Sequence, residues 1–175
     1  MAAPIRPNPV KTFGKDKWVF VATIANTAAP TAAECTAGTV LDVTMMAFDG
    51  EGYPTSSTNR PVLERRIGDT IVYEQIGIQN VTGGTMLFQI QPQAAGASDG
   101  KKAYEKFIAG TTGYFVRRMG TAVATDLAAG QFVTVYPVEF SAPFPTTVGE
   151  GESAEAAFQS EYAITSAITP LVALA

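Results

Sequence analysis

Side chains that commonly do chemistry are scarce in this chain, which has no histidine and a single cysteine among its 175 residues. Histidine is the commonest general base near neutral pH and a frequent metal ligand. Cys35 has no imidazole with which to form a nucleophilic pair, so we interpret it as a small packing residue. Catalytic triads and zinc sites are therefore not expected, and we assign no catalytic residue, no metal and no cofactor.

Charged doublets and acidic glycine-rich segments are the remaining candidate sites. Arg65-Arg66 and Arg117-Arg118 resemble phosphate-binding surfaces, but the net charge is −4 and no aromatic side chains are interleaved with them. We favour the alternative that each doublet lies at a strand edge or pairs with acids, either Glu64 or those of another subunit. Asp49-Gly-Glu51-Gly and Gly149-Glu-Gly-Glu152 lack the spacing of a calcium-binding loop and predict solvated turns.

Sequence motifs of nucleotide-binding and hydrolytic enzymes are absent from the chain, which has no Walker loop, dinucleotide fingerprint or nucleophile elbow. A glycosidase-like carboxylate pair stays open, because separation in space cannot be read from sequence. The sequence therefore favours a protein that is not an enzyme.

The composition predicts one mainly β domain over residues 1–175. Hydrophobic residues make up 46% of the chain, enough for a buried core, and 16 glycines and 11 prolines punctuate segments rich in Thr and Val. Residues 1–15 carry three prolines and predict an extended arm, which leaves residues 16–175 as the core with a C-terminal arm. There is neither a signal-peptide pattern nor a run of ~18 apolar residues, so we expect synthesis in the cytoplasm and no membrane contact.

Runs of β-branched and aromatic residues predict the strands of this domain. They cover residues 17–24, 39–48, 70–79, 85–91, 112–119, 132–140 and 155–165, with 171–174 as a final strand or an arm. Segments 70–79 and 85–91 flank Asn80-Val-Thr-Gly-Gly84 and predict a hairpin. Pro137 indicates that 132–140 is an edge strand or a bulged one.

Residues 155–165 alternate between apolar and polar side chains. One face has Phe158, Tyr162 and Ile164, and the other has Glu155, Gln159, Glu161 and Thr165. This period of two favours a half-buried strand. The alternative is a helix, because Ser153 could serve as its N-cap and Phe158 and Tyr162 are four positions apart.

Two helices and one long loop complete the expected elements. Ser98-Asp99 can cap a helix over about 98–109, which would lay an apolar stripe of Ala103, Tyr104, Phe107 and Ile108 on the sheet. A short helix is expected within 26–37, ended by Gly38. The polar segment 49–61 predicts a long inter-strand loop of the kind that usually carries function.

The order of these segments resembles the tail tube (major tail) proteins of long, non-contractile-tailed bacteriophages over most of the chain. The resemblance rests on this order more than on any single motif. It runs through Lys17-Trp-Val-Phe-Val, Thr31-Ala-Ala-Glu-Cys-Thr-Ala-Gly-Thr-Val-Leu-Asp-Val-Thr, Tyr73-Glu-Gln-Ile-Gly-Ile, Lys101-Lys-Ala-Tyr-Glu-Lys-Phe-Ile, Tyr114-Phe-Val-Arg-Arg, Pro137-Val-Glu-Phe-Ser and 155–164.

The resemblance implies a β-sandwich or partial barrel with one packed helix, and a structural subunit of the virion. Hexameric rings would stack into a hollow tube through which DNA passes without specific binding, with the tape-measure and tail terminator proteins as partners. A long loop would reach an adjacent ring. The Val62-Leu63 pair would be exposed on a solvated loop, which favours this role for a surface of Tyr53, Asn59, Arg60, Val62 and Leu63.

A channel for DNA should present acidic or neutral polar groups, because phosphates bind surfaces rich in Lys and Arg. The face formed by Glu155, Gln159, Glu161 and Thr165 has that character, so we expect it to line the lumen; an ordinary solvent-facing strand on the outer wall is the alternative. The competing function is a monomeric or trimeric β-sandwich binding module, such as a capsid decoration or adhesion domain. The oligomeric state would distinguish the two functions.

Overall fold

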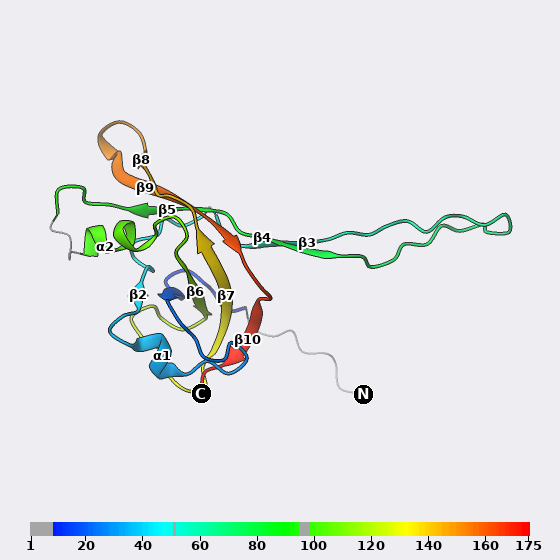
Figure 1. The fold of residues 1–175 in the computed structure, drawn as a ribbon, viewed down its shortest axis with the longest axis horizontal. Helices are drawn as coiled ribbons and strands as arrows, with labels where there is room; N and C mark the ends of the chain where they lie inside the picture. Colours follow the sequence, from blue (N-terminus) through cyan, green and yellow to red (C-terminus); the bar gives the residue numbers. More distant parts are fainter. Residues whose placement is uncertain (1–8, 51, 95–98) are drawn as a thin grey trace.

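The strands of the computed structural model curl into an open half-barrel (Figure 1). The structure describes residues 9–50, 52–94 and 99–175. Within them one sheet contains eight strands: β1 (Asp16–Val21), β2 (Leu41–Asp42), β5 (Thr85–Gln89), β6 (Thr112–Met119), β7 (Phe132–Phe140), β8 (Phe144–Val148), β9 (Glu155–Ile164) and β10 (Thr169–Ala173). Their antiparallel order is β2-β1-β6-β7-β9-β5, and β10 pairs with β7 and β8 with β9. The predicted mainly β, partial-barrel fold is confirmed.

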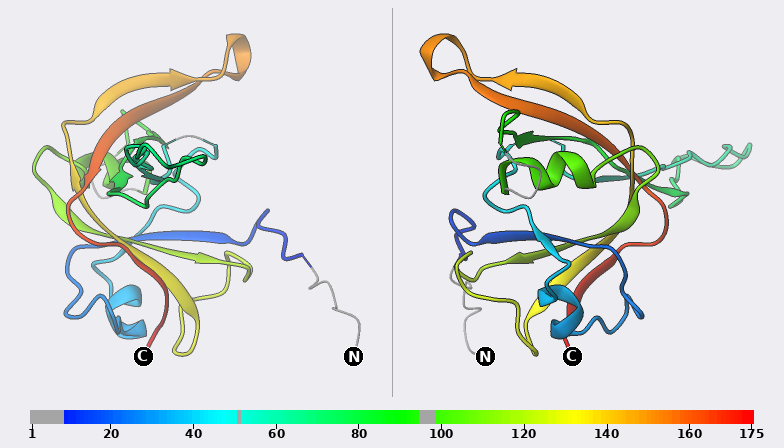
Figure 2. Two further views of the ribbon diagram at one scale, coloured as in Figure 1. Left: turned by 90° about the vertical axis from the view of Figure 1, so that its right-hand side faces the viewer. Right: turned by 60° about the vertical axis from the view of Figure 1, so that its left-hand side comes forward.

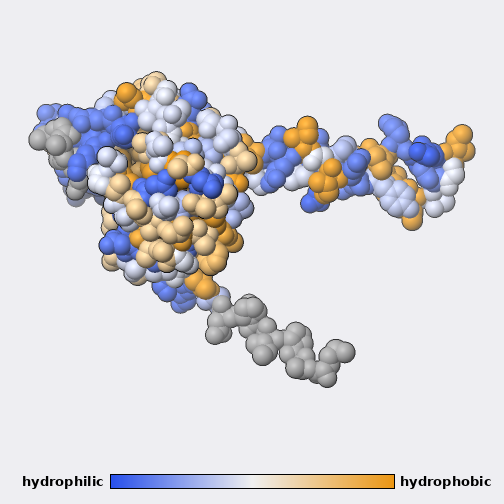
Figure 3. All heavy atoms as spheres, turned by 60° about the horizontal axis from the view of Figure 1, so that its bottom comes forward, coloured by the Kyte–Doolittle hydropathy of each residue, from blue (hydrophilic) through white to orange (hydrophobic). Residues whose placement is uncertain are grey.

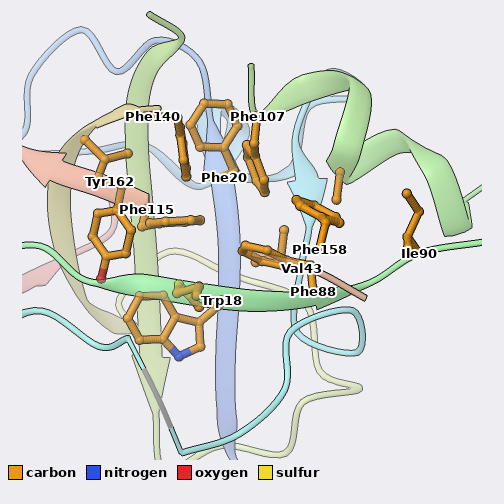
Figure 4. Packing of buried hydrophobic residues seen from close by; sticks show 13 residues of the cluster. Trp18, Phe20, Val43, Phe88, Ile90, Phe107, Phe115, Phe140, Phe158 and Tyr162 are labelled. Carbon is orange, nitrogen blue, oxygen red and sulfur yellow. The ribbon is translucent and has the colours of Figure 1, made fainter. Parts of the chain in front are cut away.

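The concave face of the sheet holds an aromatic core, covered by helix α2 (Asp99–Lys106). Six buried phenylalanines form this core: Phe20, Phe88, Phe107, Phe115, Phe140 and Phe158 (Figure 4). Three of the four predicted stripe residues pack on this core: Ala103 and Phe107 are buried, and Tyr104 is partly buried against Phe158. The Ile108 side chain is instead 54% exposed. The predicted cap Ser98 lies outside the described residues.

The convex face carries a second, aliphatic cluster that includes Val19, Val116 and Val135. Helix α1 (Ala32–Thr36) packs on part of this cluster through Cys35. It lies within residues 26–37, where a short helix was predicted. Thr31 and Glu34 form a capping box, which satisfies free backbone N–H groups at the start of the helix. β1 is thus covered on both faces, which accounts for its dense apolar sequence (Figure 2).

β9 is a strand rather than a helix, and it connects the two parts of the sheet. Its first seven residues pair with β5 and β8, and Tyr162–Ile164 pair with β7. Phe158 and Tyr162 are buried in the aromatic core, whereas Gln159 and Glu161 are exposed. The predicted alternation is confirmed, although sequence reasoning missed β8, because Pro143 and Pro145 made that segment look like a connection.

Pro137 does not mark an edge strand, because β7 is paired on both sides. On one side β10 pairs as far as Val135 and β9 begins to pair at Val138. The N–H and C=O of one strand residue point to the same side, and the Pro137 carbonyl accepts from Thr165 on that side. Pro137, which has no N–H to donate, therefore lies at the position where β10 stops pairing with β7 and β9 starts.

Two other strand predictions are wrong. Only Leu41–Asp42 of the predicted strand 39–48 is a strand, because the Asp42 carboxylate accepts from the Thr44 N–H and starts a turn. Segments 70–79 and 85–91 do not form a hairpin with each other. Instead β4 (Gln79–Thr82) pairs with β3 (Thr55–Thr58), inside the segment predicted to be a loop, and β5 pairs with β9.

Candidate functional site

A long hairpin, residues 55–82, projects from the body of the subunit (Figure 1). Beyond β3 and β4 its two chains stay paired, through hydrogen bonds from Gln75 N to Pro61 O and from Leu63 N to Tyr73 O. Near its tip the Asp69 carboxylate accepts from the Arg66 N–H at 2.8 Å. This projecting hairpin replaces the loop predicted over 49–61 and extends well beyond it.

Tight backbone contacts anchor the base of the projecting hairpin to the sheet. A Cβ on Gly83 would lie 1.9 Å from the Tyr162 carbonyl oxygen, and one on Gly84 would lie 2.6 Å from the carbonyl oxygen of Gly52. The Tyr162 hydroxyl donates to the same Gly52 oxygen at 2.6 Å. Only glycine allows these approaches, so the direction in which the hairpin leaves the body is fixed locally.

Apolar side chains along the projecting hairpin are exposed to solvent (Figure 3). They are Val62, Leu63, Ile67, Ile71, Val72, Tyr73, Ile76, Ile78 and Val81. An isolated two-stranded ribbon cannot bury both of its faces, and exposed apolar surface of this extent is typical of an interface. The hairpin therefore has the properties of a surface that another molecule covers.

The structure separates the residues that the sequence grouped on the loop. Asn59, Arg60, Val62 and Leu63 all lie on the projecting hairpin and are exposed. Tyr53 instead lies before the hairpin and stacks on Trp18, with 5.4 Å between the ring centroids. Burial, together with donation to Asp49, raises the pKa of the Tyr53 hydroxyl to about 12. Glu51 lies outside the described residues.

A polar face on the convex side of the sheet is the second candidate surface. Glu155, Gln159, Glu161 and Thr165 are all exposed, as their spacing predicts. The register extends this face: Glu161 pairs with Thr85, and the neighbouring Ala163 pairs with the exposed Glu139. Paired residues project from the same side of a sheet, so acids from β7 and β9 share one surface.

The Arg117-Arg118 doublet is not a phosphate-binding surface. Arg117 forms a bidentate ion pair with Asp16, with Nε–Oδ1 and Nη2–Oδ2 distances of 2.9 and 2.5 Å. Arg118 is 1% exposed and donates to the carbonyl oxygens of Thr121, Ala122, Thr125 and Asp126 and to the Gln131 side chain. Arg118 therefore organises the β6–β7 connection and Arg117 ties β6 to β1, with partners other than the predicted Glu64. Arg65 and Arg66 are exposed on the projecting hairpin.

A family model for phage tail tube proteins matches residues 4–175, nearly the whole chain. The chain belongs to this family. No curated protein matches the chain. The subunit is therefore a structural component of a phage tail tube, present in the virion and assembled with other subunits. This membership favours the tube over the alternative binding module.

The one cysteine of the tail tube subunit is buried. Burial, with a smaller contribution from the Glu34 charge, raises the pKa of the Cys35 thiol to about 11. The thiol is thus a poor nucleophile at neutral pH. Among the described residues, no acid or cysteine cluster has the composition of a metal site. None of the helices in that part of the chain is long and apolar enough to span a membrane.

We expect Arg118→Met to destabilise the subunit by about 2 kcal/mol, because the carbonyl oxygens around the guanidinium lose a shared charged donor. Urea unfolding followed by Trp fluorescence measures this loss. Arg65→Met on the projecting hairpin is the matched control and should change stability little, since Arg65 is exposed. Equal stability of the two variants would contradict a structural role for Arg118.

Proposed function

We propose that this tail tube subunit forms hexameric rings that stack into a hollow conduit for DNA delivery into the host cell. The observation that carries the proposal is the projecting hairpin, whose apolar side chains are unburied in the isolated subunit. A hairpin of this reach can cross from one ring to the next, where those side chains find a partner surface. Repeating one such contact between identical copies builds a tube.

Open strand edges provide a second means of association within a ring. Within the described chain, β2 pairs only with β1 and β8 pairs only with β9, so each has an open edge. The outer edge of β5 is instead covered by residues 46–48, through bonds from Phe48 N to Leu87 O and from Gln89 N to Met46 O. Unpaired N–H and C=O groups favour pairing with another strand. Lateral contacts between edges of neighbouring subunits would extend the sheets around the ring axis and close it without free edges.

We assign the polar face of Glu155, Gln159, Glu161 and Thr165 to the wall of the channel. It lies opposite the aromatic core and includes Glu139 as a further acid. Six-fold repetition of these carboxylates gives a wall that repels phosphates, so DNA passes without specific binding.

Replacing Glu155 and Glu161 with Lys should leave tubes intact and slow DNA ejection, with the defect relieved by added salt. Both side chains are exposed, so folding should be unaffected, while a basic wall binds phosphates and releases counterions. Ejection triggered in vitro at several salt concentrations measures the effect. Glu150→Lys with Glu152→Lys, on the turn before β9, is the charge-matched control. Normal ejection by assembled double-Lys particles would contradict the assignment of this face.

The proposed tube also has two protein partners, and each of its subunits is a single domain. The tape-measure protein is expected inside the tube and the terminator protein at its end, with residues 1–175 as one tail tube domain made in the host cytoplasm. No catalytic step is assigned to it. The test is electron microscopy of the purified subunit over a range of concentrations and of isolated tails. Six-fold rings and hollow fibres are expected, whereas a compact monomer at all concentrations, together with tails lacking six-fold symmetry, would contradict it.

A further inference from the structure

The direction of the projecting hairpin is decided at its base. All four residues of β3 and all four of β4 are exposed, and the two strands form a sheet of their own, separate from the main sheet (Figure 1). The exposed apolar side chains further along the hairpin belong to neither core cluster. A two-stranded ribbon without a packed face takes its direction from the two chain segments that join it to the body.

Both of these segments contact Tyr162 on β9. In the segment that leaves β4, Gly83 lies against the Tyr162 carbonyl. In the segment that enters β3, Gly52 O accepts from the Tyr162 hydroxyl at 2.6 Å. Contacts with one residue fix where the hairpin begins but leave its tilt free, and glycines allow wide changes in φ and ψ. Without a further restraint, this base would act as a hinge.

The aromatic side chain that follows Gly52 supplies a further restraint. Tyr53 stacks on Trp18 of β1, with 5.4 Å between the ring centroids and 20° between the ring planes. The Arg117 guanidinium lies over both rings, 4.9 Å from the Trp18 centroid and 5.2 Å from that of Tyr53. We call Tyr53, Trp18 and Arg117 the Tyr53 stack. It ties the segment before β3 to β1 and β6.

Two members of the Tyr53 stack are fixed by the main sheet. Trp18 is 4% exposed, and Tyr136 of β7 stacks on it with a centroid distance of 5.6 Å. Arg117 is held by its bidentate ion pair with Asp16. Only Tyr53 belongs to the base of the hairpin, so the Tyr53 stack is the junction between a rigid sheet and a movable ribbon.

Tyr53 is held by stacking rather than by close packing on all sides. The residue is partly buried and lines a pocket of about 470 Å³, so open space adjoins it. Its hydroxyl donates to Asp49 at 2.9 Å, which ties the ring to the exposed loop before it and not to the sheet. Loss of the ring would therefore release the hairpin base from β1 and β6.

The length of the hairpin amplifies any change at its base. From Thr55 to Ile67 the chain extends about 40 Å at ~3.3 Å per residue, so a swing of about 10° moves the tip by about 7 Å. Apolar contacts require heavy atoms within ~4.5 Å of each other. A small loss of direction at the base is thus enough to separate the apolar side chains near the tip from a partner surface.

We propose that the Tyr53 stack is a latch that fixes the direction of the projecting hairpin before subunits meet, and that Tyr53 and Arg117 are positioning residues for the contact between subunits. A hairpin already held in its binding direction loses less conformational freedom on assembly. If release of the latch left about one tenth of the hairpins in that direction, the apparent affinity between subunits would fall about tenfold. The effect on assembly rests on the proposed function, whereas the direction of the hairpin in a single subunit does not.

Distances between spin labels on the single subunit test the latch. Labels on Arg65→Cys, near the tip, and on Ala33→Cys, on α1, report the direction of the hairpin, since both positions are exposed and the native cysteine is buried. Val62→Asp with Ile76→Asp in the same chain keeps subunits apart, which sedimentation checks. Circular dichroism checks that each variant folds.

We expect Tyr53→Ala to broaden the distribution of distances about twofold or more, because the base becomes a hinge. Tyr53→Leu, which keeps apolar bulk without a flat ring, should broaden it as well, whereas Tyr53→Phe keeps the ring and should leave it unchanged. Arg118→Met is the control for lost stability, because that side chain alternates to the other face of β6. It should also leave the distribution unchanged. Equal widths for Tyr53→Ala, Tyr53→Leu and the native residue would overturn the proposal.

Tube assembly without labels tests the role of the latch. We expect Tyr53→Ala to raise the lowest subunit concentration that yields tubes about tenfold over that of Tyr53→Phe. Arg118→Met should change this concentration by less than about twofold. Assembly of Tyr53→Ala at the native concentration would overturn the positioning role. Weaker assembly with an unchanged distribution would mean that Tyr53 contacts the neighbouring subunit directly, and would overturn the latch. If even the native subunit forms no tubes, the proposed function fails, and the distances still decide the latch.

Discussion

Subunits in which residues 60–77 are replaced by an Asn-Gly turn are expected to fold and to form no tubes. The cut falls where Asn59 N donates to Ile78 O, so β3 and β4 keep their pairing and the turn matches a short hairpin. The deletion removes most of the exposed apolar side chains of the projecting hairpin, none of which belongs to either core cluster. Circular dichroism checks folding, and electron microscopy with sedimentation checks assembly.

A point variant separates the chemistry of the projecting hairpin from its length. Val62→Asp with Ile76→Asp places charges at two exposed apolar positions and should also prevent tube formation, because burying an unpaired carboxylate at an interface is costly. Arg65→Gln with Arg66→Gln keeps the apolar residues and should assemble. Normal tubes from the truncated subunit would show that contacts elsewhere hold the rings together.

Strands that cover a core were predictable from sequence, because the core imposes a local pattern. In β9 the buried Phe158 and Tyr162 alternate with the exposed Gln159 and Glu161, so a period of two gave both the strand and its polar face. The same reasoning located β5 and β6, within the predicted strands 85–91 and 112–119. A face that meets water or a lumen is visible in this way, but which of the two it meets is decided by neighbouring subunits.

The projecting hairpin was misread because its composition resembles that of a buried strand. Ile71, Val72, Tyr73, Ile76 and Ile78 have the β-branched and aromatic character of core residues, yet all are exposed in the subunit. The proposed assembly would bury these side chains, whereas the interpretation of the sequence assumed burial within one chain. Strand pairing adds to the difficulty. The partner of β4 is β3, which is separated from it in sequence by the whole length of the hairpin, rather than the neighbouring β5.

A pocket of about 470 Å³ beside Trp18 could not have been found from sequence. Trp18, Met45, Tyr53 and Met86 are far apart in the chain and meet only after the sheet curls. The proline-rich start was recognisable as an extended arm from its own residues, whereas the walls of this pocket are a product of tertiary structure. Sites built by distant segments leave no spacing signal.

Phe107→Ala is expected to cost about 3–5 kcal/mol of unfolding free energy, since it empties the centre of the aromatic core. The Phe107 ring is fully buried and stacks on Phe140 with 4.3 Å between centroids. It also contacts the rings of Phe20 and Phe88, each at 5.2 Å. Because it directly follows α2, its loss removes the main contact that holds this helix against the concave face.

The measurement should use the hairpin-truncated subunit, because assembly would otherwise add binding free energy to the apparent stability. In that background Phe107→Ala should lower the melting temperature by roughly 10 °C, whereas the adjacent Ile108→Ala, in a side chain that is 54% exposed, should change it by about 1–2 °C. Similar losses for both variants would mean that α2 does not pack as described. A large loss for Phe107→Ala alone would show that the curled sheet depends on this ring, and therefore that the shape presented to neighbouring subunits does too.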